Sequence, residues 1–208
     1  MASVVHDEYV TLKGESGGEL KVQGSRFIST AYSAGSAEEV EKIVAARRKK
    51  YHDASHHCYA YRLGPGGETF RINDDGEPSG TGGRPILAAI DREGLTDTLV
   101  MVTRYFGGIK LGTGGLARAY GQAARIALAG GGKAVRFITR RGRVSTSYEL
   151  EARVRDALAR HDARVTATSF DDGVHLDFVV RASQAEALVN DLRERTGGNV
   201  QLSGEAGE

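Results

Sequence analysis

The sequence predicts an α+β protein with two domains. Two observations support this class. Helical and strand patterns alternate over the first two thirds of the chain, and the pattern then changes to strand, helix, strand, strand, helix, strand. The second order, βαββαβ, is that of a ferredoxin-like domain. We therefore expect an N-terminal domain over residues 1–139 and a C-terminal ferredoxin-like domain over residues 140–208.

The N-terminal domain is expected to contain strands and three helices. Ser36, with Glu39 three residues later, forms a capping box that marks a helix start. Pro85 suits the first turn of a second helix because its ring presets the φ angle. In chain order the expected elements are two short strands between Glu19 and Tyr32, a helix from Ser36, strands His56–Leu63 and Thr69–Ile72, a helix over Ile86–Arg92, a buried strand Thr98–Tyr105, a helix after Gly115 and a strand Ala134–Thr139.

The C-terminal domain follows a basic run, Arg140–Arg143, that we expect to be a linker. Asp171-Asp172-Gly173 is a hairpin signal between the two middle strands. Ser183 with Glu186 forms another capping box, and Gly197-Gly198 is expected to end that helix. The expected elements are strand Val144–Leu150, helix Glu151–His161, strands Arg164–Phe170 and Val174–Val180, helix Ser183–Arg195 and strand Asn199–Leu202.

Composition argues against several classes of protein. The formal net charge is +1, so a nucleic acid or an anionic membrane would have to bind to a local basic patch. The single cysteine, Cys58, excludes an internal disulfide framework. We recognise no secretion signal and no apolar stretch of membrane-spanning length. We therefore expect a cytoplasmic protein with no membrane partner.

Glycine is the unusual residue, with 28 copies and two clusters in the N-terminal domain. In the second cluster, Gly107–Gly115, the segment Gly112–Ala117 matches the dinucleotide pattern G-x-G-x-x-A. A Rossmann site is disfavoured, because the segment does not follow its strand directly and no acidic residue lies about 20 positions later. A P-loop is excluded because no G-x-x-x-x-G-K-[ST] string occurs.

The same glycines suggest a simpler binding site. Glycines ahead of a helix leave backbone N–H groups exposed at the positive end of the helix dipole, and Lys110 and Arg118 stand nearby. This pattern predicts a site for an anion such as a phosphate group. The alternative is that the glycines only allow a strand and a helix to pack tightly.

Three carboxylates, Asp74, Asp75 and Glu77, lie in the polar loop Asn73–Arg84. Converging carboxylates can hold a hard cation such as Mg²⁺, and paired acids can divide acid and base roles. Asp-Asp-Gly and Glu-Pro-Ser-Gly are also ordinary turn sequences. We favour turn formation, expect no cofactor or bound metal, and keep Mg²⁺ as the alternative.

His56 and Cys58 share one face of a predicted strand, whereas His57 and Tyr59 share the other. Zinc needs three or four such ligands, and the chain has no second cysteine. A Cys–His nucleophilic pair is also awkward, because residues two apart on a strand are about 6.5–7 Å apart at Cα. We favour a buried structural pair.

Several segments together resemble the YigZ/IMPACT family. They are Ser25–Ile28, His56–Tyr61, Asp74–Pro85 and Val102–Leu116, the last continuing through Arg118-Ala119-Tyr120. The resemblance implies an N-terminal fold similar to the second domain of a ribosomal small-subunit protein and of RNase PH. It also implies a C-terminal domain similar to a ferredoxin-like domain of elongation factor G. Eukaryotic members of the family act in translational control.

Two functional hypotheses follow. The first is a non-enzymatic, translation-associated regulatory or binding module for RNA, the ribosome, a translation factor or another protein partner, supported by the basic clusters Arg47–Lys50 and Arg140–Arg143. The second is a metal-assisted hydrolase or phosphoryl-transfer enzyme with its cleft between Asn73–Arg84 and Gly107–Gly115. We favour the first, and leave the presence of catalysis open.

The candidate residues fall into three groups. Candidate catalytic residues are Asp74, Asp75 and Glu77. Candidate residues for binding a phosphate-containing ligand are Arg84, Arg104, Gly107, Gly108, Lys110, Gly112, Gly114, Gly115 and Arg118. Candidate structural residues are Arg26, His56 and Cys58.

Overall fold

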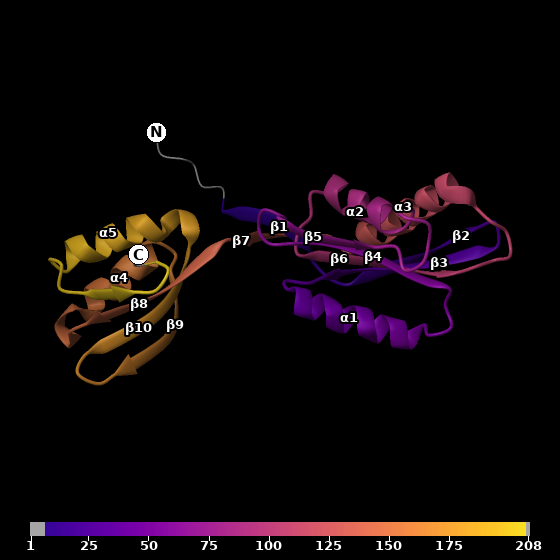
Figure 1. Cartoon of the computed structure of the whole chain (residues 1–208). Helices are drawn as coiled ribbons and strands as arrows, with labels where there is room; N and C mark the ends of the chain where they lie inside the picture. Colours follow the sequence, from indigo (N-terminus) through magenta and orange to yellow (C-terminus); the bar gives the residue numbers. More distant parts are fainter. Residues whose placement is uncertain (1–6, 207–208) are drawn as a thin grey trace. The chain divides into compact units, whose positions relative to one another are not determined.

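A computed structural model describes residues 7–206 of the chain. The protein has a mixed α+β fold, which confirms the predicted class, and it divides into two compact units (Figure 1). One unit is Tyr9–Arg136, and the other contains residues 137–206 together with residues 7 and 8. Within the described range, no helix is both long and apolar enough to cross a membrane.

The unit Tyr9–Arg136 contains a five-stranded sheet of order β2-β3-β6-β4-β5, in which all neighbouring strands are antiparallel. Strands β1 and β7 pair separately, and β1 was not predicted from the sequence. The strands are β1 Glu8–Leu12, β2 Ser16–Val22, β3 Ser25–Ser33, β4 His56–Leu63, β5 Thr69–Asn73, β6 Thr98–Tyr105 and β7 Lys133–Phe137. The helices are α1 Ala37–Lys50, α2 Gly83–Arg92 and α3 Gly112–Gly130.

Helices α2 and α3 cover one face of this sheet, and α1 covers the other (Figure 1). Alternation along β4 explains both layers, because Cys58 and Ala60 pack with α2 and α3 whereas Tyr59 and Tyr61 pack with α1. The predicted face assignment of this strand is therefore confirmed. On the α2/α3 side the core is large and apolar, and it includes Ile86 and Leu116, which lie near the starts of the two helices.

The start of α1 confirms the predicted capping box. The Ser36 hydroxyl accepts a hydrogen bond from the Glu39 N–H at 3.2 Å. The Glu39 carboxylate accepts one from the Gly35 N–H at 2.9 Å, one residue earlier than the usual reciprocal bond. Helix α2 begins at Gly83, so Pro85 stands in its first turn as predicted.

The C-terminal unit has a four-stranded antiparallel sheet of order β11-β8-β10-β9, with α4 and α5 packed on one face. In chain order this is 4-1-3-2, the ferredoxin-like arrangement that the sequence predicts. The elements are β8 Thr139–Thr146, α4 Glu151–Arg160, β9 Arg164–Phe170, β10 Val174–Arg181, α5 Ala185–Arg195 and β11 Gln201–Ser203, with short 3₁₀ turns at Tyr148–Leu150 and Ala182–Gln184.

Two predictions for this unit are wrong. Arg140–Arg143 is not a linker but part of β8, because Gly142 fits against the buried Phe178 ring while its charged neighbours are exposed. Ser183 does not cap α5. It lies in a 3₁₀ turn and its N–H donates to the Asp7 carboxylate at 3.1 Å, so the helix starts at Ala185 without a side-chain cap.

Candidate functional site

One edge of the five-stranded sheet brings together the segments that the sequence singles out. Strands β5 and β6 are both antiparallel to β4, so they end at the same edge and lead there into α2 and α3. The turn at Gly24-Ser25 lies at this edge as well, because Arg26 pairs with Tyr105 at the end of β6. The acidic loop, the second glycine cluster and two helix starts therefore share one edge.

Glu77 is buried and joins three parts of this edge. Its Oε1 accepts hydrogen bonds from Arg104 Nη1 at 2.7 Å and from the Tyr120 hydroxyl at 2.8 Å. Arg104 is only 4% exposed and also donates to the Ser25 hydroxyl at 3.2 Å. Burial raises the pKa of Tyr120, so its hydroxyl stays protonated and donates. The structure thus places Glu77 in a buried ion pair and Arg104 in the interior.

Asp74 occupies the start of α2. Its Oδ1 accepts hydrogen bonds from the N–H groups of Gly82 and Gly83 at 2.9 and 2.8 Å, and its Oδ2 accepts one from Gly80 at 2.8 Å. Burial alone would raise the pKa of Asp74, but these hydrogen bonds and nearby Arg84 hold it below its usual value. Asp74 therefore supplies the cap that Gly82, at the N-cap position, has no side chain to provide.

Asp75 is also bound by groups of the protein. Its two oxygens accept hydrogen bonds from the Arg48 guanidinium and from the His57 N–H, the latter at 2.7 Å. All three loop carboxylates thus have protein donors. Within residues 7–206, one set of three His, Cys, Asp or Glu side chains has its ligand atoms close enough for a metal, and it lies in the C-terminal unit: Asp171, Asp172 and His175.

His56 and Cys58 hold the acidic loop against β4. His56 Nδ1 makes a 2.8 Å hydrogen bond with the Asp75 carbonyl, and the Cys58 thiol donates to the Asp74 carbonyl at 3.1 Å. Burial raises the pKa of Cys58 to about 12, so the reactive thiolate is not populated at neutral pH. These contacts are what a structural pair would make.

The glycines of the second cluster, Gly107–Gly115, are required by the fold for different local reasons or not at all. A Cβ on Gly107 would lie 1.9 Å from the carbonyl carbon of Gly24, so Gly107 is needed for packing. Gly108 and Gly112 have φ values of +87° and +67°, which disfavour other residues. Packing and backbone conformation thus account for these three.

Gly114 is the exception. It lies in the first turn of α3, and the nearest atom to a Cβ built there is Nη1 of Arg118, at 3.5 Å. Glycine in a helix costs roughly 0.5–1 kcal/mol relative to alanine. The fold does not require this glycine, whereas a group approaching the backbone from outside would.

Helix α3 begins at Gly112, so the prediction that Gly112, Gly114 and Gly115 lie ahead of the helix is wrong. They form its first turn, because the preceding loop ends at Leu111. Leu111 makes no side-chain capping bond, and the first turn contains no acidic residue. Within the described chain, no acceptor outside the helix receives a hydrogen bond from Gly112, Thr113 or Gly114 N–H.

Exposed cations surround this helix start. The Arg118 guanidinium lies back over the first turn, beside Gly114, and Lys110 is exposed in the loop before the helix. Arg84 is exposed in the first turn of α2. In the described part of the chain, none of these three has a carboxylate within 4.0 Å. Arg26 differs, since it is exposed and pairs with Glu19 at 2.9 Å.

The two basic clusters are less available than their sequences suggest. Arg47 is buried, with its guanidinium carbon 4.5 Å from the centre of the Tyr51 ring, and Arg48 pairs with Asp75. In the second cluster, Arg143 pairs with Asp177 at 2.6 Å. In both clusters, therefore, some of the basic side chains are already engaged within the protein and are not free to bind a partner.

Sequence reasoning missed the polar role of Tyr120 in α3. Tyr120 is fully buried and packs edge-to-face on Phe27, with ring centroids 5.2 Å apart. A buried tyrosine hydroxyl usually needs a hydrogen-bond partner, so a polar partner for Tyr120 could have been predicted. Its identity as Glu77 could not, because no sequence spacing links the two residues.

Comparison with known proteins agrees with both units. The family model described as the Impact N-terminal domain matches residues 23–128, and a domain of unknown function, DUF1949, matches residues 144–199. The IMPACT family member YvyE of Bacillus subtilis is 33% identical over 194 residues, covering 93% of this chain and 89% of that protein. The IMPACT family member YigZ of Escherichia coli is 30% identical over 190 residues, covering 88% and 90%.

A solved structure extends the similarity to the whole fold. It is described as the crystal structure of a hypothetical protein, and it has a TM-score of 0.73 at 27% identity. The similarity covers 96% of this chain and 98% of that one. An IMPACT family member of Thermus thermophilus is 51% identical over 107 residues, which is 51% of this chain and 56% of that protein.

Proposed function

The chain belongs to the IMPACT family, and we propose that it is a non-enzymatic, translation-associated binding protein that recognises phosphate groups of RNA at the start of α3. The observation that carries this proposal is the uncapped first turn of α3, with its free N–H groups at Gly112, Thr113 and Gly114. A helix start of this kind attracts anions through its N–H groups and its dipole.

Two further features support phosphate as the bound group. Arg118 lies over the same turn and has no carboxylate partner in the described range, so it can donate to a phosphate oxygen. Gly114 leaves the backbone accessible at a position where the fold tolerates a side chain. The family resemblance implies domains similar to those of a ribosomal protein and of elongation factor G, which suggests that the phosphates belong to a component of the translation apparatus.

The alternative, a metal-assisted hydrolase or phosphoryl-transfer enzyme, needs free carboxylates at this edge. Asp74, Asp75 and Glu77 each accept hydrogen bonds or form ion pairs within the protein. A metal would have to displace these donors, and loss of the Arg104 partner would leave a buried unpaired charge. These engagements support a binding role over catalysis.

A pair of matched substitutions at Thr113 tests the proposal. Thr113 is exposed in the first turn of α3. Thr113→Glu places a carboxylate at the helix start, which favours the helix but repels phosphate, whereas Thr113→Gln has similar size and no charge. We expect Thr113→Glu to weaken binding of a fluorescent single-stranded oligouridylate about tenfold at low salt, and Thr113→Gln to change it less than about twofold.

Both variants should unfold at or above the wild-type temperature, which separates loss of binding from loss of structure. Equal affinities for wild type and Thr113→Glu would refute the α3 site. Absence of binding by the wild type at low salt would refute RNA as the partner.

A further inference from the structure

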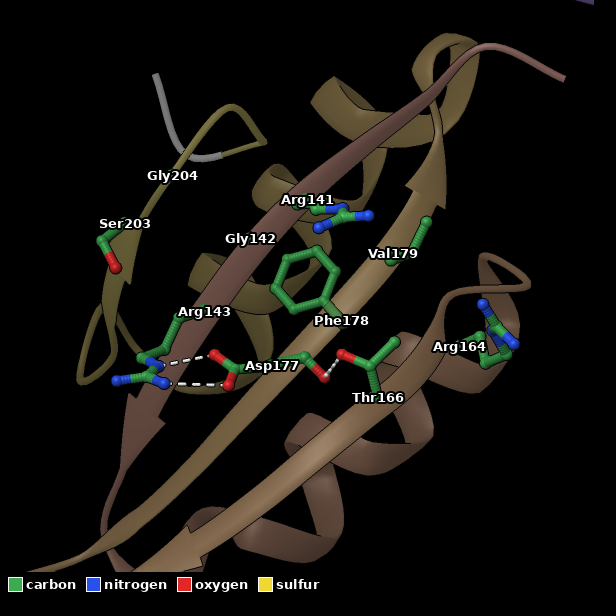
Figure 2. Close-up of a pocket in the computed structure, with 10 residues that line it drawn as sticks. All are labelled: Arg141, Gly142, Arg143, Arg164, Thr166, Asp177, Phe178, Val179, Ser203 and Gly204. Carbon is green, nitrogen blue, oxygen red and sulfur yellow. Dashed lines mark hydrogen bonds and ion pairs between the residues drawn. The ribbon is translucent and has the colours of Figure 1, made fainter. Parts of the chain in front are cut away.

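The C-terminal unit has one sheet face without a helical layer. Helices α4 and α5 cover the side that carries Val144, Leu176 and Phe178. The residues between these on β8 and β10 point to the opposite side, which we call the open face. A pocket of about 540 Å³ lies at this sheet and is lined by residues of β8, β9, β10 and β11. Figure 2 shows the side chains that line it.

Strand register arranges the open face in rows. Val179 of β10 lies opposite Arg141 of β8 on one side and Arg164 of β9 on the other. Because neighbouring strands are about 4.8 Å apart, the two arginine backbones are about 10 Å apart with Val179 between them. Figure 2 shows the two guanidinium groups on either side of Val179.

The next row contains an acidic residue, and two more, Asp171 and Asp172, lie at the hairpin end of the face beside His175. Asp177 lies opposite Arg143 and Ala167, and it forms a two-bond ion pair with Arg143 at 2.6 and 2.8 Å. The Arg143 guanidinium thus neutralises the negative charge of Asp177. Arg181, in the row with Thr139, is exposed and adds a further cation. The rows of Val179, Asp177 and Arg181 therefore carry four arginines and one aspartate, an excess of positive charge.

Arg141 and Arg164 of the open face differ from three of the five arginines on α4 and α5. Arg155 pairs with Glu151, Arg160 with Asp156, and Arg195 with Asp191, all within 3.0 Å. Within the described residues, neither the Arg141 nor the Arg164 guanidinium forms an ion pair within 4.0 Å, although the Glu205 carboxylate accepts a hydrogen bond from the Arg141 backbone N–H at 3.4 Å. A solvated surface needs only mixed charges, as on the helices. On the open face, the guanidinium groups of Arg141 and Arg164 remain without a carboxylate partner.

We infer that the open face binds the sugar–phosphate backbone of single-stranded RNA, with Arg141 and Arg164 as its main phosphate contacts. Guanidinium groups donate in pairs to phosphate oxygens and can also stack on unpaired bases. A four-stranded sheet can accept an unpaired strand across its face. The rows of Val179, Asp177 and Arg181 contain no exposed aromatic residue that could read bases. We therefore expect binding to these rows to be independent of RNA sequence.

This surface lies in a different unit from the start of α3, and the inference does not depend on that site. The test uses the full chain with the substitutions Arg141→Gln and Arg164→Gln combined. The matched control combines Arg153→Gln and Arg193→Gln, which remove the same charge from exposed positions on α4 and α5. Fluorescence anisotropy with labelled oligouridylate and oligoadenylate is recorded over a series of salt concentrations.

We expect the open-face variant to bind both RNAs about tenfold more weakly and with a salt dependence flatter by about 1.4 in log–log slope. The control variant should stay within about twofold of wild type. Asp177→Asn should have the opposite effect and tighten binding, because it frees Arg143 and removes the negative charge of Asp177.

The outcomes separate this inference from the proposed function. If Thr113→Glu weakens RNA binding but the open-face variant does not differ from its control, the open-face inference is wrong and the α3 proposal stands. If only the open-face variant weakens binding, the assignment to α3 is wrong. Weaker RNA binding by Asp177→Asn than by wild type also contradicts the inference. So does a result in which wild type binds duplex RNA as tightly as single-stranded RNA and the open-face variant binds the duplex equally well.

Discussion

Helices α2 and α3 start at the same edge of the five-stranded sheet, and both starts are rich in glycine, yet their N–H groups are treated differently. At α2, Asp74 reaches back from the acidic loop and accepts hydrogen bonds from Gly82 and Gly83. At α3, the N–H groups of Gly112 and Gly114 have no acceptor within the described chain.

The difference shows how glycine-rich helix starts can serve structure or binding in one fold. At α2 the negative charge that the helix dipole favours is built into the chain, so the glycines allow the loop to approach closely. At α3 the chain supplies cations, Lys110 and Arg118, and no anion. In the proposed function, an anion from a partner would complete the second helix start as Asp74 completes the first.

The largest predicted effect comes from removing the buried Glu77 carboxylate, which links the acidic loop before α2 to β6 and to the interior of α3. Glu77→Ala leaves Arg104 buried without its partner, and Tyr120 loses its acceptor. Breaking a buried ion pair in this way costs about 3–5 kcal/mol. We expect urea unfolding to show a loss of that size, whereas Glu41→Ala, at an exposed position of α1, should change stability by less than about 0.5 kcal/mol. A small effect of Glu77→Ala would mean that this residue does not hold the acidic loop to β6 and α3.

A smaller effect is expected when the α2 cap is neutralised. Asp74→Asn weakens charged hydrogen bonds, which contribute about 1.5–3 kcal/mol. The pKa of Asp74 lies below its ordinary value of 3.8 in the folded protein, so its stabilisation is present above 3.8 and is lost as pH falls through the folded pKa. The stability difference between wild type and Asp74→Asn should therefore be constant at neutral pH and shrink in acid. A difference that grows on acidification would contradict the assigned role.

The smallest predicted effect has the opposite sign. Gly114→Ala should stabilise the protein by about 0.5–1 kcal/mol, because alanine favours the helix and nothing in the fold occupies the space of its methyl group. Gly107→Ala is the matched contrast, since its methyl group would overlap Gly24 and should destabilise by at least about 1–3 kcal/mol. Thermal unfolding measures both signs, and a destabilised Gly114→Ala protein would show that the glycine serves the fold.

Regular periodicity in the sequence was enough to predict most elements. The run Thr98–Tyr105 is a strand with those bounds, and the βαββαβ pattern is present in the C-terminal unit. Arg140–Arg143 was misread because arginines are compatible with both a linker and the open face of a sheet. What distinguishes the two cases is Phe178, which packs on Gly142 from the neighbouring strand β10, 36 positions later in the sequence.

The site was predicted only in part, for a similar reason. Sequence patterns located the loops, and strand direction in the fold explains why they meet. They could not show that Asp74 caps α2, because the carboxylate reaches Gly83 nine positions away across a folded loop. They also could not separate the packing role of Gly107 from the open position of Gly114, since both are glycines in one cluster.

The comparison between the two helix starts can be measured directly by recording backbone amide NMR spectra of the full chain while single-stranded oligouridylate is added. The account predicts large shifts for the amides of Gly112, Thr113 and Gly114, and small shifts for Gly82 and Gly83, whose N–H groups already bind Asp74. Unchanged amides at Gly112–Gly114 while RNA binds, or equal shifts at both helix starts, would contradict it.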